Sequence, residues 1–258
     1  MDIKDYIFNN QAYFEDFITR STYHSNAIEG NTLSYAETYA ILFNDNDFKV
    51  SAKPREIYEA INHKYAMNYV LNHLEEDLSE TMIKDIAILI NRNISEISGY
   101  RTVPVRIRGA EHIPPEPSQL SQMMMYYVYN YNHTAFDDIY QKIAQMHVQF
   151  ERIHPFEDGN GRTGRLLLNY ELLRNNLAPI VIQKDQRTDY FKMLEHNDSV
   201  GLSRFFKELS EQEQQRIDSM PIKESVLDKL SNNKKLVEPK KTGPEKTKSV
   251  KEHDDTIR

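Results

Sequence analysis

The feature that most constrains this chain is the run His154–Arg165, whose sequence is HPFEDGNGRTGR. It combines one histidine, two adjacent acids, three glycines, one asparagine and two arginines. Upstream, apolar residues recur at steps of four and three between Ile139 and Ile153, which predicts an amphipathic helix. Downstream, residues 166–173 are apolar almost all round, which is typical of a buried helix. Because Pro155 disfavours the α conformation at the residue before it, we expect a tight loop between the two helices.

The glycine-rich end of this run is suited to binding an anion. The first amides of a helix lack intrahelical partners and carry the positive end of its dipole, and glycines let several amides point into one concavity. Arg162 and Arg165 are three residues apart, so they share a face and can hold further anionic oxygens through forked hydrogen bonds. Asp158 could hold Mg²⁺ against phosphate oxygens. His154, with an unperturbed pKa of ~6.5, suits a general base. The constellation indicates phosphoryl or nucleotidyl transfer from a magnesium nucleotide.

Three other interpretations fit the run less well. Residues 159–164 match the G-x-G-x-x-G pattern of dinucleotide-binding proteins, but that pattern requires a preceding strand, and a helix is expected here. Residues 158–162 begin like a calcium-binding loop, yet Arg162 stands at a ligand position and Thr163 where such a loop needs glycine. A glycine-rich turn with solvated charges is the simplest alternative. The number of chemically useful groups in one short run favours a functional site over such a turn.

The run resembles the signature of the Fic (filamentation induced by cAMP) family, H-x-F-x-[D/E]-G-N-G-R-x-x-R, and it fills every fixed position. The activity usual in that family is transfer of AMP from ATP to a protein hydroxyl. The resemblance implies that His154 is the base and that Phe156 anchors the loop in the core. It places Mg²⁺ on Asp158 rather than on Glu157. It implies that the nucleotide is held by five residues of the loop and helix start: Gly159, Asn160, Gly161, Arg162 and Arg165.

A second motif lies upstream. Local signals predict a short helix over about residues 21–30, with Gly30 as its terminating glycine. Ser25-x-x-x-Glu29-Gly30 also resembles the inhibitory-helix motif of the same family, [S/T]-x-x-x-E-[G/N]. The resemblance implies that the Glu29 carboxylate reaches the nucleotide site and pairs with Arg165, so that this arginine is not free for the γ-phosphate.

Residues 101–113 carry the clearest strand signal in the chain. Apolar residues alternate with proline and arginine up to a turn at Gly109-Ala110, which predicts a β-hairpin. The hairpin resembles the family's flap, which aligns the target protein by strand pairing. The residues expected to bind the target are Val103, Val105, Arg106 and Ile107. A purely structural hairpin is the alternative.

A helix is predicted to begin at Arg187, and the matching family segment lines the adenine pocket. Within it, Tyr190 is the candidate for stacking on the base, and Asn197 is the candidate for hydrogen bonding. Ordinary helix packing is the alternative for both residues.

The predicted fold class is mainly α, a Fic-like helical domain with one short β-hairpin flap. A first helix is expected over about residues 2–20. Two further helix starts are expected at Ser34, with Glu37 completing a capping box, and at Ser79. The tail is rich in lysines, acids and prolines and has too few apolar residues to order itself. The expected organisation has four parts: an N-terminal helical region over 1–78 that carries the inhibitory helix, a catalytic domain over 79–210, a C-terminal helical extension over 211–231 and a disordered tail over 232–258.

Composition narrows the function classes. The 258 residues carry a net charge of −7 with no basic face in the body, which argues against nucleic-acid binding as the main role. The chain has no cysteine, so disulfides and thiol chemistry are excluded. The N-terminus does not resemble a signal peptide, and no apolar run approaches membrane-spanning length. We therefore expect a cytoplasmic protein without a membrane partner. The sequence leaves open whether the chain forms a homo-oligomer.

The leading hypothesis is an ATP- and Mg²⁺-dependent protein adenylyltransferase that is autoinhibited by Glu29. Its partner would be a target protein with an accessible Ser, Thr or Tyr hydroxyl, or the protein itself. The same site could instead remove AMP from a modified protein, with Glu29 orienting the attacking water. A third hypothesis is a non-catalytic module whose hairpin binds peptides. The sequence alone does not separate the forward from the reverse reaction.

Overall fold

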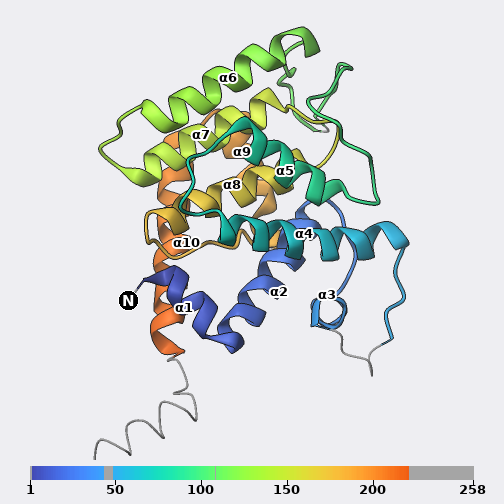
Figure 1. The fold of residues 1–258 in the computed structure, drawn as a ribbon, viewed down its shortest axis with the longest axis vertical. Coiled ribbons are helices and arrows are strands. Elements are labelled where there is room, and N and C mark those ends of the chain that lie inside the picture. Colours follow the sequence, from blue (N-terminus) through green and yellow to red (C-terminus); the bar gives the residue numbers. More distant parts are fainter. Residues whose placement is uncertain (1, 44–48, 108, 221–258) are drawn as a thin grey trace, which may run out of the picture. The chain divides into compact units, whose positions relative to one another are not determined.

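The computed structural model describes residues 2–43, 49–107 and 109–220. Within them the chain forms ten α-helices and one 3₁₀ turn (Figure 1). In chain order, these elements are α1 (Ile3–Asn9), α2 (Gln11–Ile28), α3 (Tyr35–Phe43), α4 (Pro54–Asn72), α5 (Glu80–Asn91), α6 (Pro117–His133), α7 (Ile139–Ile153), α8 (Asn160–Arg174), η1 (Lys184–Gln186), α9 (Arg187–Glu195) and α10 (Ser199–Ser219). The predicted mainly α class is confirmed.

All of these elements belong to one compact unit, Met1–Ile222. The boundaries predicted after residues 78 and 210 both fall inside it, and α10 runs through the second of them. The tail predicted from residue 232 lies outside the described residues. None of the described helices combines the length and the apolar character needed to cross a bilayer.

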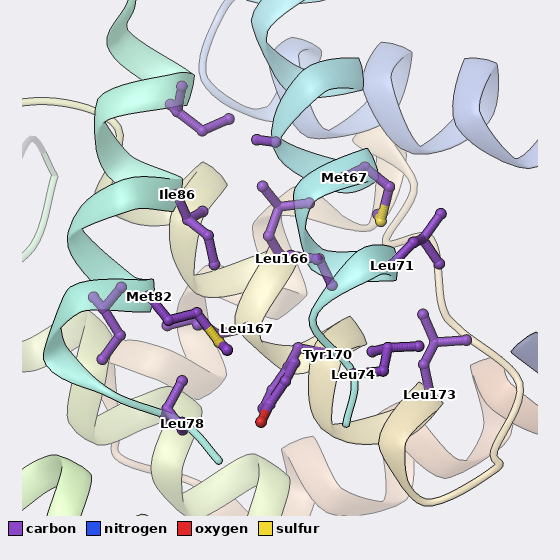
Figure 2. Packing of buried hydrophobic residues seen from close by; sticks show 14 of the residues in the cluster. Met67, Leu71, Leu74, Leu78, Met82, Ile86, Leu166, Leu167, Tyr170 and Leu173 are labelled. Carbon is purple, nitrogen blue, oxygen red and sulfur yellow. The ribbon is translucent and has the colours of Figure 1, made fainter. Parts of the chain in front are cut away.

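Helix α8 lies at the centre of the packing, because it contacts α2, α4, α5 and α7. Of its 15 residues, 13 are buried, so the prediction of a buried helix after the glycine-rich run is confirmed. Figure 2 shows Leu166, Leu167 and Tyr170 of α8 packed between Met67 of α4 and Ile86 of α5. Each fully buried side chain of this kind contributes about 1.5–3 kcal/mol. The start of α8 is therefore held on a rigid support.

Several helix starts follow from side-chain caps that the sequence carries. Ser34 and Glu37 form a reciprocal capping box, in which the Ser34 amide donates to the Glu37 carboxylate at 2.8 Å and the Glu37 amide donates to Ser34 Oγ at 3.2 Å. Ser79 Oγ accepts from the Met82 amide at 3.1 Å. These two predicted starts are confirmed.

The N-terminal prediction needs a correction at Asn10. This residue breaks the expected helix over residues 2–20 into α1 and α2, with φ −118° and ψ 86°, and its side chain caps α2 by accepting from the Tyr13 amide at 3.1 Å. Helix α2 then continues without interruption to Ile28. The segment predicted as a separate short helix over 21–30 is the last part of this longer helix.

The predicted β-hairpin is not confirmed, because residues 101–107 and 109–113 form no strand. A two-stranded hairpin is marginal unless a third strand or an apolar surface supports it. Here Val103 is 49% exposed, so its side chain is only about half covered. Pro104 also lacks the amide that a strand ladder would use. The segment begins instead at Arg101, whose guanidinium holds it to the loop after α7.

Candidate active site at the start of α8

The loop between α7 and α8 is closed by its own polar groups. Helix α7 ends at Ile153, and its C-cap residue His154 adopts the left-handed conformation with φ 50°. Pro155 disfavours the helical conformation at the residue before it, so the helix does not continue. Phe156 is fully buried, as predicted for a loop anchor. The Asn160 side chain accepts from the Phe156 amide at 2.9 Å and donates to the Phe156 carbonyl at 2.8 Å. The Asn160 amide group thus shapes the loop, and its contact with a nucleotide stays a prediction.

Gly159 is the N-cap of α8 and has φ 78°, a conformation that favours glycine. A Cβ atom there would lie 2.6 Å from Asn91 Nδ2 and 2.9 Å from Ile90 Cγ2. Asn91 also donates to the Asp158 carbonyl at 3.2 Å, so α5 clamps the loop from outside. The amides of the first turn of α8 start directly after this glycine, which gives the predicted concave helix start.

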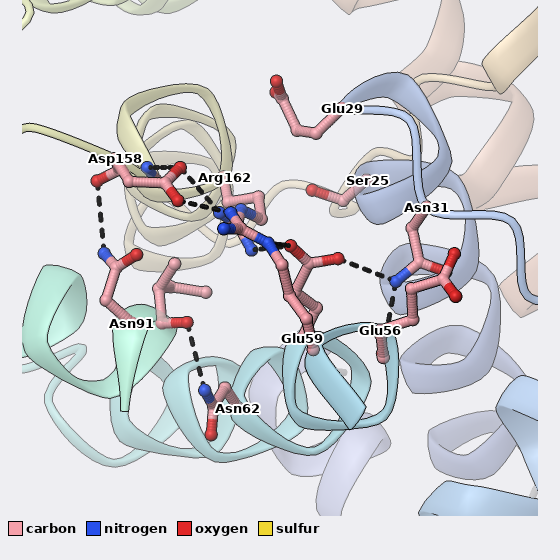
Figure 3. Close-up of polar contacts among 12 residues, drawn as sticks. Ser25, Glu29, Asn31, Glu56, Glu59, Asn62, Asn91, Asp158 and Arg162 are labelled. Carbon is pink, nitrogen blue, oxygen red and sulfur yellow. Dashed lines mark hydrogen bonds and ion pairs between the residues drawn. The ribbon is translucent and has the colours of Figure 1, made fainter. Parts of the chain in front are cut away.

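Asp158 and Arg162, predicted to bind metal and nucleotide respectively, contact each other (Figure 3). Arg162 Nη2 donates to Asp158 Oδ1 at 3.0 Å, and Arg55 Nη2 donates to Asp158 Oδ2 at 2.5 Å. Burial by itself would raise the pKa of the Asp158 carboxyl, but Arg162 and Arg55 hold it below its usual value. The carboxylate is therefore ionised, and it is 33% exposed toward solvent.

This donor set fits a magnesium ion only in part. In the residues that the structure describes, no three carboxylates or histidines gather into a metal site. Asp158 is a single hard oxygen ligand, so an ion bound there would draw its remaining ligands from phosphate oxygens and water, as Mg²⁺ commonly does.

Glu29 reaches the start of α8 from the end of α2. Its Oε1 accepts from Arg165 Nη2 at 2.8 Å, as predicted. A Cβ atom on Gly161 would lie 2.4 Å from the same Oε1, so the carboxylate rests directly over the first turn of α8. Arg165 also donates from Nε to Ser25 Oγ at 3.0 Å and from Nη2 to the Ser25 carbonyl at 2.9 Å. The structure thus brings together all three residues of the predicted Ser25–Glu29–Arg165 cluster.

Glu29 is held in place by the way in which α2 ends. Gly30 has φ 100°, and its amide donates to the Ala27 carbonyl at 3.0 Å. The Asn31 amide donates to the Asn26 carbonyl at 3.1 Å. These two bonds form a Schellman motif with Gly30 at the left-handed position, as predicted for this glycine.

The surroundings of His154 favour the neutral form of its imidazole. Its Nδ1 lies 3.2 Å from the Glu151 carbonyl. Since a carbonyl only accepts, Nδ1 carries the proton, and Nε2 has its lone pair free to accept one. Burial lowers the pKa of His154, although the bond to the Glu151 carbonyl opposes that shift. The imidazole is thus uncharged at neutral pH and able to act as a base.

His154, Glu29, Gly161 and Arg165 line one pocket of about 670 Å³. The predicted base, the helix start and the predicted arginine therefore face a single space. Other walls come from α9 and from the segment that includes Arg106 and Ile107.

The remaining predicted residues are placed less directly. Val103 and Val105 do not line this pocket, whereas Arg106 and Ile107 do. Tyr190 lies at the pocket wall but is fully buried, and its hydroxyl is 2.6 Å from His147 Nε2. Its stacking on adenine stays a prediction.

Asn197 is exposed, in the turn that follows α9, with φ 54°. It is not among the residues that line the 670 Å³ pocket. Its proposed hydrogen bond to the base stays a prediction.

Sequence reasoning missed several polar residues that hold the site. Arg101, which is 3% exposed, donates to the carbonyls of His154 at 2.9 Å, Val103 at 3.0 Å and Pro115 at 2.6 Å. No local pattern indicates this role, because the partners are up to 53 residues away. Arg55 and Glu59, by contrast, have the i,i+4 spacing of a helix ion pair, which could have been noticed.

Glu151 was also missed. Its Oε1 is buried and makes no hydrogen bond to any described residue. Burial raises the pKa of Glu151 to about 7, with Arg165 opposing that shift and Glu29 adding to it. It lines the pocket together with His154, three residues later on α7.

The fold and the site together define a helical protein in which a glycine-rich helix start lies beside a neutral histidine. Residues 77–172 match the family model described as Fic/DOC family. Proteins named "Protein adenylyltransferase Fic" from Drosophila grimshawi and Drosophila melanogaster are 34% and 35% identical over 192 residues, which is 71% of this chain. This chain spans only 38% and 37% of the length of those two relatives. Residues 77–172 therefore form a Fic/DOC family domain.

Solved structures agree with this assignment. A Fic domain-containing signalling protein from Bacteroides thetaiotaomicron superposes with a TM-score of 0.74 at 23% identity, over 86% of this chain and 93% of that one. Fic-1 from C. elegans superposes with a TM-score of 0.71 at 27% identity, over 83% of this chain and 65% of that one. The first likeness concerns the fold alone.

Proposed function

We propose that this protein is a protein adenylyltransferase that moves AMP from ATP to a hydroxyl group of a target protein. The observation that carries the proposal is the single pocket in which His154 faces the start of α8 and Arg165. The names of the curated relatives favour this forward transfer over removal of AMP and over an idle binding module.

The reaction needs a base, an anion cradle and room for the acceptor. The target hydroxyl oxygen attacks the α-phosphorus of ATP, the bond from that phosphorus to the bridging oxygen breaks, and pyrophosphate leaves. His154 Nε2 takes the hydroxyl proton, because Nδ1 is already protonated and held by the Glu151 carbonyl. The amides of the first turn of α8 and the two arginines hold the phosphates, which supplies the positioning on which phosphoryl chemistry depends.

Asp158 would hold Mg²⁺, which neutralises charge on the phosphates when it is bound. The carboxylate is ionised and partly exposed, and arginines fix both of its oxygens, so it is oriented toward the helix start. Replacing Asp158 by alanine should abolish the magnesium dependence together with transfer, whereas replacing the exposed Glu157 by alanine should leave both unchanged.

Glu29 restrains the enzyme in this proposal. Its carboxylate rests over Gly161 and pairs with Arg165, so it places negative charge where the phosphates of ATP would bind. Like charges at this distance disfavour binding in the productive pose. Arg165 donates from Nε and Nη2 to Ser25 and Glu29, so only its Nη1 is left for a phosphate oxygen and a forked grip on the phosphate is blocked.

The segment around Arg106 and Ile107 would receive the target. Both residues line the pocket that contains His154, and Arg106 is exposed. A segment without a partner strand presents backbone groups that an extended target peptide could pair with. The flap would then complete a hairpin-like pairing only when the target is bound.

The test is transfer of label from α-labelled ATP with Mg²⁺, using the Glu29→Gly variant as the released form. We expect labelling of the protein itself or of lysate proteins by this variant. Adding His154→Ala to it should abolish labelling without loss of ATP binding in calorimetry. If both variants label equally, or neither labels, the assignment of transfer to this site is wrong.

A further inference from the structure

The chain that follows Glu29 is tied to the same helix that supports Arg162 (Figure 3). Asn31 Nδ2 donates to Glu59 Oε2 at 2.8 Å and to the Glu56 carbonyl at 3.2 Å. Asn31 Oδ1 accepts from the Leu33 amide at 3.0 Å. Hydrogen bonds thus hold both polar atoms of the Asn31 side chain, Nδ2 and Oδ1, two positions after Glu29.

The other oxygen of the Glu59 carboxylate faces the phosphate side of the site. Glu59 Oε1 accepts from Arg55 Nε at 3.0 Å and lies 3.4 Å from Arg162 Nη1. The Arg162 side chain is 2% exposed, and its other carboxylate partner is Asp158. Glu59 is therefore the interior counter-ion of a buried arginine that is predicted to bind the nucleotide.

We propose that Glu59 is a positioning residue shared by the inhibitory segment and the nucleotide site. One of its oxygens orients Arg162, and the other holds Asn31 and, through it, the end of α2 that carries Glu29. This inference rests on the proposed function and names how the two parts of that site are coupled. A carboxylate is rigid, so the contacts of Oε1 with Arg55 and Arg162 fix the position in which Oε2 is presented to Asn31.

The position of Asn31 in the helix end explains why it can control Glu29. Asn31 supplies the amide that closes the Schellman motif, and Glu29 is the capping residue two positions earlier. Loosening Asn31 therefore loosens the backbone from which the Glu29 carboxylate extends. Asn31 does not contact Arg162, whose carboxylate partners are Asp158 and Glu59. A change at Asn31 therefore leaves the predicted phosphate-binding residues in place.

The simpler alternative is that Glu59 only stabilises the fold through its ion pairs. Such a role would change the unfolding transition, but it would not make the effect of an Asn31 variant depend on the presence of Glu29. Nor would it shift the KM for ATP while kcat stays unchanged. These two dependencies separate the positioning role from a structural one.

The first experiment uses Asn31→Asp, which keeps the oxygen that accepts from Leu33 and turns the bond to Glu59 into a repulsion between carboxylates. We expect it to raise AMP transfer by roughly 10-fold in the otherwise intact chain, the effect of losing one hydrogen bond to a charged group. In the Glu29→Gly background it should change the rate by less than about 2-fold, since sites that act through one another are not additive. Thr32→Val is the matched control, because Thr32 Oγ1 bonds to Glu56 and not to Glu59.

The second experiment measures ATP binding by calorimetry in the Glu29→Gly background, with and without Glu59→Gln. We expect the added change to weaken ATP binding by roughly 10-fold and to raise KM for ATP while kcat stays within about 2-fold. Glu59→Asp serves in place of Glu59→Gln if thermal unfolding shows that the first variant does not fold.

The outcomes separate this inference from the proposed function. If Glu29→Gly transfers no AMP, the proposed function fails, and the calorimetric comparison still tests the orientation of Arg162 by Glu59. If Glu29→Gly transfers AMP but Asn31→Asp acts equally in both backgrounds, or has no effect in the intact chain, the coupling is refuted. Unchanged ATP affinity in the Glu59 variants would refute the positioning of Arg162.

Discussion

Replacing Glu29 by glycine removes one carboxylate from the pocket and leaves the Arg165 guanidinium with its bonds to the Ser25 hydroxyl and carbonyl. The backbone tolerates the change, because Glu29 is the capping residue of α2 with φ −86° and ψ −1°. Gly30 already ends the helix. We therefore expect α2 to keep its position and the effect to come from the lost side chain.

The size of the effect follows from the exposure of the pair. A hydrogen bond to a charged group contributes about 1.5–3 kcal/mol. The Arg165 side chain is 7% exposed but that of Glu29 is 35% exposed, so solvent screens the pair and the lower half of this range applies. About 1.5–2 kcal/mol corresponds to a ~10–30-fold increase in the rate of AMP transfer at subsaturating ATP, since ~1.4 kcal/mol is tenfold.

Glu29→Gln separates charge from shape. The amide keeps the volume over Gly161 but removes the negative charge, so it should release most of the activity if electrostatic repulsion is the cause. It should release little if the side chain acts by filling the space. Initial rates of label transfer for the wild type, Glu29→Gly and Glu29→Gln give the answer, with ATP affinity measured in parallel. Equal rates and equal affinities for all three proteins would refute the restraint.

His154→Ala should lower the rate of transfer by ~10²–10⁴-fold, the typical contribution of a general base, while calorimetry shows ATP binding unchanged; loss of ATP binding would show that the histidine acts as a ligand instead. Gly159→Ala should lower the free energy of unfolding by about 1–3 kcal/mol, since a Cβ there meets the α5 side chains at a positive φ. Gly99→Ala, where a Cβ meets nothing within 4 Å, is the control in the same urea titration, and equal losses would show that the clamp by α5 is unimportant. Burial raises the pKa of Glu151 from 4.5 to about 7, so the folded state keeps a proton that the unfolded chain has released between those values. The free energy of unfolding should therefore fall as pH rises across that interval, by up to about 3 kcal/mol, and Glu151→Gln should remove this part of the pH dependence in urea titrations at about pH 5 and about pH 8; an identical pH profile in the variant would place the titration elsewhere.

Local patterns were enough to predict most of the helices and the loop. The stripe from Ile139 to Ile153, the capping box at Ser34 and the end of α2 at Gly30 each depend on neighbours within one or two turns. The break at Asn10 was missed, because an asparagine inside an aromatic-rich stretch gives only a weak local signal against a continuous helix.

The hairpin and the polar supports depend on the fold as a whole. An alternating pattern becomes a strand only where a partner strand or an apolar face is available, and Val103 stays about half exposed in a segment whose described residues form no strand. Arg101 and Glu59 are ordinary charged residues in the sequence, and their roles arise from partners that the fold brings close from distant segments. Tyr190 was predicted by resemblance, and the structure buries it against His147.

The two arginines of the loop differ in a way that bears on how the site works. Arg162 keeps Asp158 and Glu59 as partners whatever happens to α2, because Asp158 lies in the loop directly before α8 and Glu59 lies on α4, which packs on α8. Arg165 is equally buried, yet within the described residues its one carboxylate partner is Glu29, which is only partly covered. A buried guanidinium without an anion costs several kcal/mol. Removing Glu29 therefore leaves a charge that a phosphate oxygen can neutralise, so we expect Arg165, the arginine that α2 holds, to contribute most to the change in ATP affinity.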